Sequence, residues 1–230
     1  EDRPVLSEEP AFNLDVKYAG ETVASKLARI REEMKEAGTN VHIVSTIDDI
    51  CWTLNIRGND IDFFPLVLSY GIITMDSFEL YIDEKKLDDK LKAKLAKDGV
   101  NLHPYNDIYE DVKKFGSDVV AMIDPGKLNY ALFNNIPENV KTVEKRNPAI
   151  LMKAIKNPVE IENIRKAQIK DSVAHVRFMK WLKENVGKET ITEMSASDKL
   201  DEFRAEMGGF IRPSFGPISA FGEHSAIVHY

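Results

Sequence analysis

The longest regular pattern of apolar residues lies between residues 152 and 182. Its start has capping chemistry, because Asn157 can accept a hydrogen bond from a free backbone N–H, Pro158 needs no such bond, and Glu160 can reach back to close a capping box. Apolar residues then return at helical spacing, with no Gly or Pro before Gly187. Since the second half is apolar on two faces, the pattern predicts a long helix that lies between layers and opens a new domain.

Upstream of this helix, short apolar stretches of two kinds alternate along the chain. Residues from Val23 to Met34 recur at helical spacing until a stop at Gly38, whereas Val41–Val44 is a short β-branched run typical of a buried strand. Such alternation is typical of an α/β layer structure, and a hairpin around residues 75–77 would make its sheet mixed. The pattern predicts further helices at 47–54, 84–97, 108–115 and 127–133, and further strands at 65–74, 78–82, 101–103, 119–123 and 140–143.

Breaks in these patterns predict how the chain divides into domains. Residues 1–16 are rich in Pro and Glu and lack periodicity, which favours a linker from a preceding domain. The sequence Arg146-Asn147-Pro148 interrupts the α/β alternation before the long helix. We therefore expect one domain at residues 17–148 and the N-terminal part of a second at residues 149–230.

Downstream of the long helix, the pattern predicts one more helix and a hairpin. Thr190 followed by Glu193 predicts a second capping box, with a helix that runs to about Met207. Two stretches rich in strand-forming residues, 214–221 and 225–230, then flank a turn, which predicts two strands.

Composition narrows the classes of function. The chain has 31 Lys and Arg against 38 Asp and Glu, a net charge of −7, which argues against nucleic acid or an anionic membrane surface as a partner. It has no apolar run long enough to cross a membrane, and its first residues do not resemble a signal peptide, so we expect a cytoplasmic protein. The single cysteine, Cys51, excludes an internal disulfide and a Cys-based zinc site, and we expect it to be a small buried apolar residue.

Histidines offer few candidates for chemistry. The sequence has no Gly-rich phosphate-binding loop and no Gly-x-Ser-x-Gly nucleophile elbow. His224 and His229 are five residues apart, a spacing that places them on opposite faces of a strand, so we do not expect them to ligate one metal ion. His229 lies in an apolar stretch, where a lone histidine is more often a core residue than a catalyst. We expect His42, His103 and His175 to be structural.

Charged residues that could form a site also have simpler structural explanations. Asp48-Asp49 and Asp60/Asp62 fall at a helix start and in a polar loop, where Asp serves capping and turns. Asp171 falls inside the apolar stripe of the long helix, so we expect it to be buried with hydrogen-bond partners. Arg57 could bind a carboxylate in bidentate fashion, although a loop arginine is more commonly a fold or interface contact.

Three blocks of sequence, in order, resemble one family. Residues 155–167, IKNPVEIENIRKA, look like the entry to the pita-bread metallopeptidase domain shared by aminopeptidase P, prolidase and creatinase. Residues 49–60, DICWTLNIRGND, followed by Pro65, resemble the middle domain of the three-domain, cytosolic type of Xaa-Pro aminopeptidase. Residues 214–230, with Ala226-Ile227-Val228-His229-Tyr230 at their end, resemble the first strands of that catalytic domain.

The resemblance implies a fold and a reaction. The fold is a creatinase-type middle domain with a mixed α/β sheet, followed by the N-terminal helices and first strands of an α+β pita-bread domain. The reaction is release of the N-terminal residue from proline-containing peptides with proline in second position, by two metal ions, Mn(2+) or else zinc or cobalt, that activate a water. The family's five ligands are two Asp, one His and two Glu, and the resemblance places them downstream of this chain. We therefore expect this piece to bind no metal and to be inactive by itself, and the intact enzyme to be a homodimer.

One functional residue follows from the resemblance, and it is His229, whose counterpart contacts the substrate or stabilises its developing charge. Ser225 and His224 differ from the Gly and Asn of many relatives, which affects the turn before this strand. A prolidase or creatinase-type hydrolase, a non-catalytic pita-bread module that binds peptides, and an unrelated pair of α/β domains remain as alternatives. An unfinished sheet would also leave an exposed edge, so we expect either self-association through it or poor packing near residue 230.

Overall fold

The computed structural model describes residue 2 and residues 5–226 of the chain. It divides into two compact units, one formed by residues 1–61 and 65–160 and the other by residues 62–64 and 161–230. Each unit is described by itself below.

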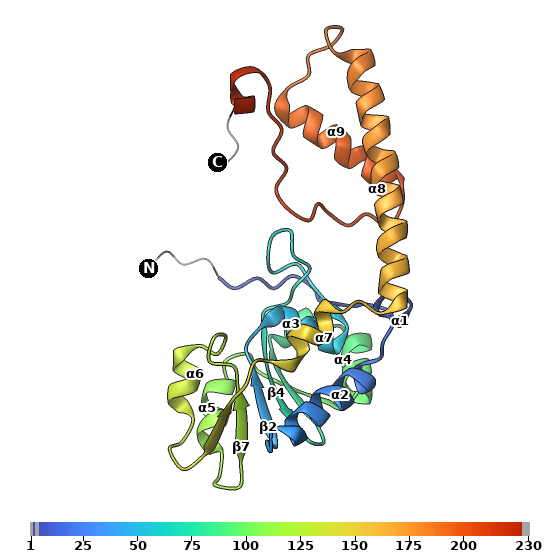
Figure 1. The fold of residues 1–230 in the computed structure, drawn as a ribbon. Coiled ribbons are helices and arrows are strands. Elements are labelled where there is room, and N and C mark those ends of the chain that lie inside the picture. Colours follow the sequence, from blue (N-terminus) through green and yellow to red (C-terminus); the bar gives the residue numbers. More distant parts are fainter. Residues whose placement is uncertain (1, 3–4, 227–230) are drawn as a thin grey trace. The chain divides into compact units, whose positions relative to one another are not determined.

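The first unit is built on a six-stranded mixed sheet with the strand order β6-β5-β4-β2-β7-β8 (Figure 1). β2 pairs in antiparallel fashion with β4 and in parallel fashion with β7, so the sheet is mixed, as the alternating pattern predicted. The strands are β2 (Val41–Val44), β4 (Ser69–Thr74), β5 (Phe78–Ile82), β6 (Val100–His103), β7 (Val120–Ile123) and β8 (Lys141–Glu144).

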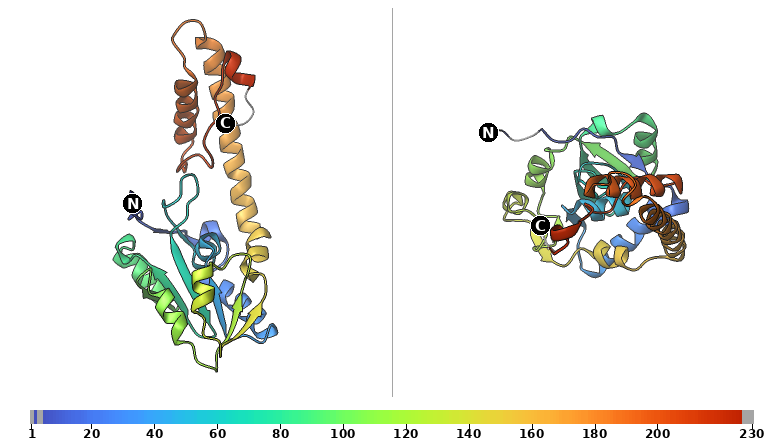
Figure 2. Two further views of the ribbon diagram at one scale, coloured as in Figure 1. Left: turned by 90° about the vertical axis from the view of Figure 1, so that its left-hand side faces the viewer. Right: turned by 90° about the horizontal axis from the view of Figure 1, so that it is seen from above.

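Helices cover both faces of this sheet (Figure 1, Figure 2). Because side chains alternate along a strand, Val44 of β2 packs with one set of helices while Val41 and Ile43 pack with the other. The first face carries α2 (Val23–Glu36), α3 (Ile47–Leu54), α4 (Asp89–Lys97) and α7 (Pro148–Ala154). The second face carries α5 (Ile108–Asp111), the 3-10 turn η2 (Val112–Lys114) and α6 (Tyr130–Asn135).

Several predicted element boundaries move because side chains cap or pair the backbone locally. The charged helix expected at 84–97 is split into a 3-10 turn, η1 (Glu84–Lys86), and α4, whose cap Asp88 accepts a hydrogen bond from the Leu91 N–H at 2.7 Å. The expected strand at 65–74 begins only at Ser69. Within the region expected to be a linker, β1 (Phe12–Asn13) pairs with β3 (Ile56–Arg57) and is followed by the short α1 (Val16–Ala19).

The second unit consists mainly of α8 (Pro158–Asn185), which begins at the end of the first unit, and α9 (Glu193–Glu206). The capping box predicted at the start of α8 is confirmed, because Asn157 Oδ1 accepts from the Glu160 N–H and Glu160 Oε2 accepts from the Asn157 N–H, both at 2.9 Å. The box predicted from Thr190 and Glu193 is wrong. Thr192 and Ser195 cap each other's backbone instead, and Glu193 is already helical.

α8 is not covered on two sides in the described structure, which contradicts the expectation from its apolar pattern. Ala174 is its one buried residue, and Ile169 and Val176 are 65% and 66% exposed. α9 runs alongside α8, where Arg204 Nε donates to Asp171 Oδ1 at 2.8 Å (Figure 2). These two helices therefore cover only part of the apolar surface that the sequence provides.

Candidate functional site

The hairpin predicted at residues 214–230 is wrong as far as the structure describes it. Residues 208–221 form no strand, and Gly222–Ala226 is a 3-10 turn, η3. The turn is fixed by Glu193, whose Oε1 accepts from the Phe221 N–H at 2.7 Å and lies 2.9 Å from His224 Nδ1. A strand forms only where a neighbour supplies ladder hydrogen bonds, and no described segment does so here. His229 lies outside the described residues, so its place in a site stays a prediction.

The described part of the chain does not fit a dinuclear metal centre. Within residue 2 and residues 5–226, no group of three or more His, Cys, Asp or Glu side chains could hold a metal ion. His224 contacts Glu193, and the resemblance assigns no ligand to either residue. No catalytic step through a metal is therefore derived from these residues.

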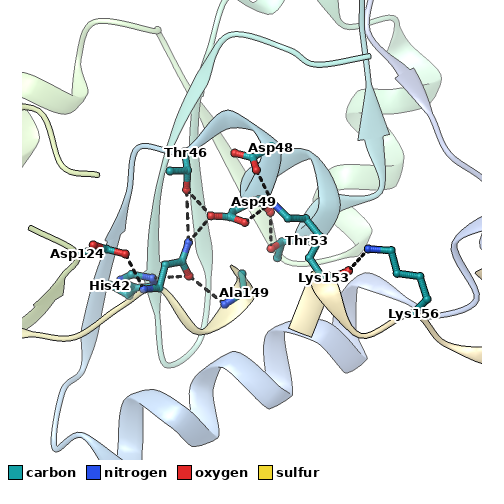
Figure 3. A network of polar contacts seen from close by, with 10 residues as sticks. His42, Thr46, Asp48, Asp49, Thr53, Asp124, Ala149, Lys153 and Lys156 are labelled. Carbon is teal, nitrogen blue, oxygen red and sulfur yellow. Dashed lines mark hydrogen bonds and ion pairs between the residues drawn. The ribbon is translucent and has the colours of Figure 1, made fainter. Parts of the chain in front are cut away.

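A buried polar cluster lies where the parallel strands β2, β7 and β8 end (Figure 3). Asp49, in the first turn of α3, is 1% exposed and stands at its centre. Its carboxylate accepts hydrogen bonds from Thr46 Oγ1 at 2.6 Å, Asn147 Nδ2 at 2.9 Å and Lys153 Nζ at 2.7 Å. A buried carboxylate needs such partners, so Asp49 is a structural anchor rather than a simple helix-start residue.

Asn147 connects three elements through its own hydrogen bonds. Its Oδ1 accepts from the Ala149 N–H at 3.1 Å and caps α7, while its Nδ2 binds Asp49 of α3. Its backbone N–H donates to Asp124 Oδ2 at 2.9 Å, just after β7. The break that the sequence marked at residues 146–148 is therefore a fixed junction between strands and helices.

His42, on β2, is fully buried and belongs to the same network. Its Nδ1 lies 3.2 Å from the Met122 carbonyl oxygen and its Nε2 lies 3.2 Å from Asn147 Oδ1. Burial lowers the pKa of His42, although the Met122 carbonyl, Asn147, Asp49 and Asp124 oppose that effect. The expectation that His42 is structural is thus confirmed.

Lys153, on α7, completes the cluster from the solvent side. Its ammonium group binds both Asp48 and Asp49. Burial alone would lower the pKa of Lys153, but hydrogen bonds to these two carboxylates outweigh it and raise the pKa. The pair of aspartates therefore fastens α7 to α3.

Comparison with known proteins identifies the family. The creatinase/prolidase N-terminal domain matches residues 2–160, more than half of the chain, and metallopeptidase family M24 matches residues 162–230. The chain belongs to the creatinase/prolidase family. This membership agrees with the mixed sheet of the first unit and with the family named from the three sequence blocks.

Curated relatives of this creatinase/prolidase-family chain are Xaa-Pro aminopeptidases. The probable Xaa-Pro aminopeptidase P of Sordaria macrospora is 36% identical over 100% of this chain and 39% of its own length. Xaa-Pro aminopeptidase 1 of Dictyostelium discoideum is 37% identical over 100% of this chain and 37% of its own length. The chain therefore spans about two fifths of the length of these relatives.

A solved structure covers the whole chain. The X-prolyl aminopeptidase of Caenorhabditis elegans, described as a cytosolic enzyme with a di-nuclear active site, matches with a TM-score of 0.92 at 33% identity. The match covers 100% of this chain and 38% of that protein. An Xaa-Pro dipeptidase from Bacillus anthracis matches with a TM-score of 0.55 at 16% identity, which shows a shared fold alone.

Other residues singled out from the sequence have structural roles in this family member. Cys51 is buried, and burial raises its pKa to about 11, which makes the thiol unreactive. Arg57 donates to the carbonyl oxygens of Cys51 and Ile56, so it is a fold contact. Asp171 was expected to be buried, but its side chain is 40% exposed and pairs with Arg204 of α9. The apolar pattern of the sequence indicated a face of α8 that could be buried. It did not reveal that part of this face stays exposed in the described structure.

Asp60 takes part in a buried ion pair that the loop sequence did not reveal. Its Oδ2 lies 2.5 Å from Lys86 Nζ and accepts from the Leu68 N–H at 2.6 Å, and both charged side chains are at most 2% exposed. The explanation by turn chemistry was therefore incomplete. Asp60 and Lys86 are 26 residues apart, so no local sequence pattern links them. Only the fold identifies this pair.

Lys26 is a second buried cation that sequence analysis missed. Its Nζ donates to the Trp52 carbonyl oxygen and to Asn55 Oδ1, both at 2.7 Å, and lies 4.4 Å from the centre of the Trp52 ring. Burial lowers its pKa to about 8, with Glu21 opposing the shift. A signal was present, because Lys26 adjoins Leu27 on the apolar stripe of α2.

None of the described helices is long and apolar enough to cross a membrane.

Proposed function

We propose that this chain is part of a metal-dependent aminopeptidase that releases the N-terminal residue from peptides with proline in second position. The match to the C. elegans X-prolyl aminopeptidase over the whole chain, at a TM-score of 0.92, carries the proposal. Relatives at 36% and 37% identity that also span the whole chain support it, because both are named Xaa-Pro aminopeptidases. A prolidase, a creatinase-type hydrolase and a non-catalytic binding module are not favoured, because the relatives at 33–37% identity are named aminopeptidases, whereas the dipeptidase match is only 16% identical.

The cofactor of the longer protein would be a pair of metal ions, which we propose to be Mn(2+). A di-nuclear active site in the C. elegans relative supports two ions, and the identity of the metal is our inference from the family. Such ions generate a hydroxide nucleophile and polarise the scissile carbonyl. Since residue 2 and residues 5–226 offer no cluster of ligands, the ions would be bound elsewhere in the longer protein.

His229 would then act on the substrate side of that site. An imidazole N–H can donate a hydrogen bond to a peptide carbonyl oxygen or to the negative charge that develops on it. We propose residues 1–16 as a linker, 17–148 as the middle domain and 149–230 as the start of the catalytic domain. We further propose a cytoplasmic homodimer that acts on proline-containing peptides, with no nucleic acid or membrane partner, in keeping with the net charge of −7.

The proposal is tested by comparing this chain with the longer protein on one Xaa-Pro peptide in the presence of manganese. We expect no sustained hydrolysis by residues 1–230 and steady release of the first residue by the longer protein. In the longer protein, His229→Ala should lower kcat/KM by about 10²-fold or more, as removal of one oxyanion donor does elsewhere.

His224→Ala is the matched control, because His224 contacts only Glu193 among the described residues, and it should keep near-normal kcat/KM. Sustained hydrolysis by the 230-residue chain would contradict the assignment of the metal site to other residues. A longer protein that binds manganese but cleaves no Xaa-Pro peptide would overturn the proposed activity.

A further inference from the structure

The order of strands in the first unit reverses at β2. From β2 the chain builds β4, β5 and β6 on one side, and then returns to build β7 and β8 on the other. The helix after β2, α3, packs on one face of the sheet, whereas the helix after β7, α6, packs on the opposite face. In open α/β sheets the diverging connections at such a point leave a crevice beside the carboxyl ends of the strands, and ligands bind there.

A pocket is present at this point. It has a volume of about 560 Å3, within the range of small-molecule sites. Its lining comes from the segments that follow β2, β7 and β8, and from α3 and α7, and includes Thr46, Asp124, Pro125, Lys127, Arg146 and Ile150. All of these residues belong to the first unit.

Most charged groups around this pocket already have partners. Asp48 and Asp49 bind Lys153, Asp124 accepts the backbone N–H groups of Gly126 and Asn147, and Lys145 lies 2.9 Å from Glu33. These contacts, drawn in Figure 3 for the aspartates and Lys153, hold the lining side chains in place. The charged lining side chains that lack a partner therefore decide which ligand could bind.

Three charged lining residues have no ion-pair or hydrogen-bond partner for their side chains among the described residues: Lys127, Arg146 and Glu144. Two are cationic and one is anionic, and all are exposed. Arg146 can bind a carboxylate in bidentate fashion, and Lys127 can add a second positive charge. Glu144 supplies an acceptor for an ammonium group, and Pro125 and Ile150 provide apolar surface.

We propose that this pocket binds a small zwitterion, a free α-amino acid with an aliphatic side chain. The carboxylate contacts Arg146 and Lys127, the ammonium group contacts Glu144, and an aliphatic side chain lies against Ile150 and Pro125. A simple anion would leave Glu144 unpaired, and a simple cation would leave Arg146 and Lys127 unpaired. The site needs no metal, and none of its residues has a role in the proposed peptidase activity, so the two proposals can be tested independently.

The test is a titration of the 230-residue chain, followed by calorimetry and by backbone amide NMR shifts. Leucine is expected to bind saturably and to shift amides of residues 45–49, 124–127 and 144–147. N-acetylleucine, which lacks the ammonium group, and isoamylamine, which lacks the carboxylate, are expected to bind at least 10-fold more weakly.

Three variants locate the binding groups. Arg146→Met should weaken leucine binding at least 10-fold, and Lys127→Met should weaken it several-fold. Glu144→Gln should remove the preference for leucine over N-acetylleucine. Lys97→Met, at an exposed lysine at the end of α4 outside the pocket, is the matched control and should bind leucine normally.

Absence of saturable leucine binding would overturn the proposal, as would equal affinity for leucine and N-acetylleucine in the unmodified chain. Unchanged binding by Arg146→Met would exclude this pocket as the location. All three pocket residues are exposed, so unfolding of a variant is not expected to obscure the result.

Discussion

Two buried lysines show that the same residue type is stabilised in different ways. Lys86 is paired with the carboxylate of Asp60, so its charge is neutralised within the fold. Lys26 has only neutral oxygen acceptors and the face of Trp52, so burial dominates and its pKa falls to about 8. A neutral amine can still donate both hydrogen bonds, which explains how Lys26 can lose its proton without losing its contacts.

The low pKa of Lys26 predicts a pH dependence of stability. In the unfolded chain this lysine keeps its proton up to its ordinary pKa of 10.5, whereas the folded chain releases it near pH 8. The unfolded state therefore binds more protons between these values, so the free energy of unfolding rises with pH, by at most about 1.4 kcal/mol per pH unit. This contribution is fully present above pH 10.5 and is lost progressively as the pH falls from 10.5 to about 8.

The measurement is urea unfolding of the unmodified chain and of Lys26→Met at pH 7.5, 9 and 10.5. The variant removes the titrating group at similar volume, so the difference in stability between the two proteins isolates Lys26. That difference should grow with pH in favour of the unmodified chain. A constant or shrinking difference would show that Lys26 keeps its ordinary pKa.

Among the elements, those with local signals agree best with the sequence. α2, β2 and α3 lie where their periodicity placed them, because each has a continuous apolar stripe or run and a clear stop. The start of α8 agrees because Asn157, Pro158 and Glu160 act on the backbone next to them. The predicted N-cap of α9 was misplaced by two residues, because Thr190 and Thr192 are the same residue type and cap a helix equally well.

The capping box of α8 should contribute measurably to stability. Asn157→Ala removes both its hydrogen bond to the Glu160 N–H and the bond from its Nδ2 to the Ala19 carbonyl oxygen at 2.8 Å. We expect a loss of about 1 kcal/mol in the free energy of unfolding, measured by urea denaturation. Asn157→Asp keeps an acceptor for the cap and loses only the bond to Ala19. Its free energy of unfolding should therefore lie between those of the unmodified chain and Asn157→Ala. Equal stability of Asn157→Ala and the unmodified chain would contradict a role of the cap.

At the scale of the whole molecule, the second unit leaves several large apolar side chains exposed among the described residues. Ile169 and Val176 on α8 and Phe215 and Phe221 beyond α9 are 65%, 66%, 71% and 83% exposed. Scattered apolar residues are normal on a surface, and contact between copies of the chain could remove these four from water. The expectation of self-association therefore stays a prediction.

Sedimentation velocity across a concentration series measures this association. We expect the chain to form dimers or larger species as its concentration rises, because buried contact between copies removes apolar surface from water. Val176→Glu should weaken the association. Gln168→Glu adds the same charge to an exposed polar position of α8 and serves as the control. A monodisperse monomer at all concentrations, with residues 214–226 protected from hydrogen exchange, would contradict the prediction.

The sequence by itself determined the α/β alternation, the start of α8 and the family, because periodicity, capping and ordered motifs act through residues close in the chain. It could not locate the Asp49 network or the pairing of Asp60 with Lys86, since Asn147 and Lys153 lie about a hundred residues from Asp49, and Lys86 lies 26 from Asp60. Such contacts exist only once the sheet brings its strand ends together. The tertiary structure likewise decided which side chains are left without partners, and these are the groups available to a ligand.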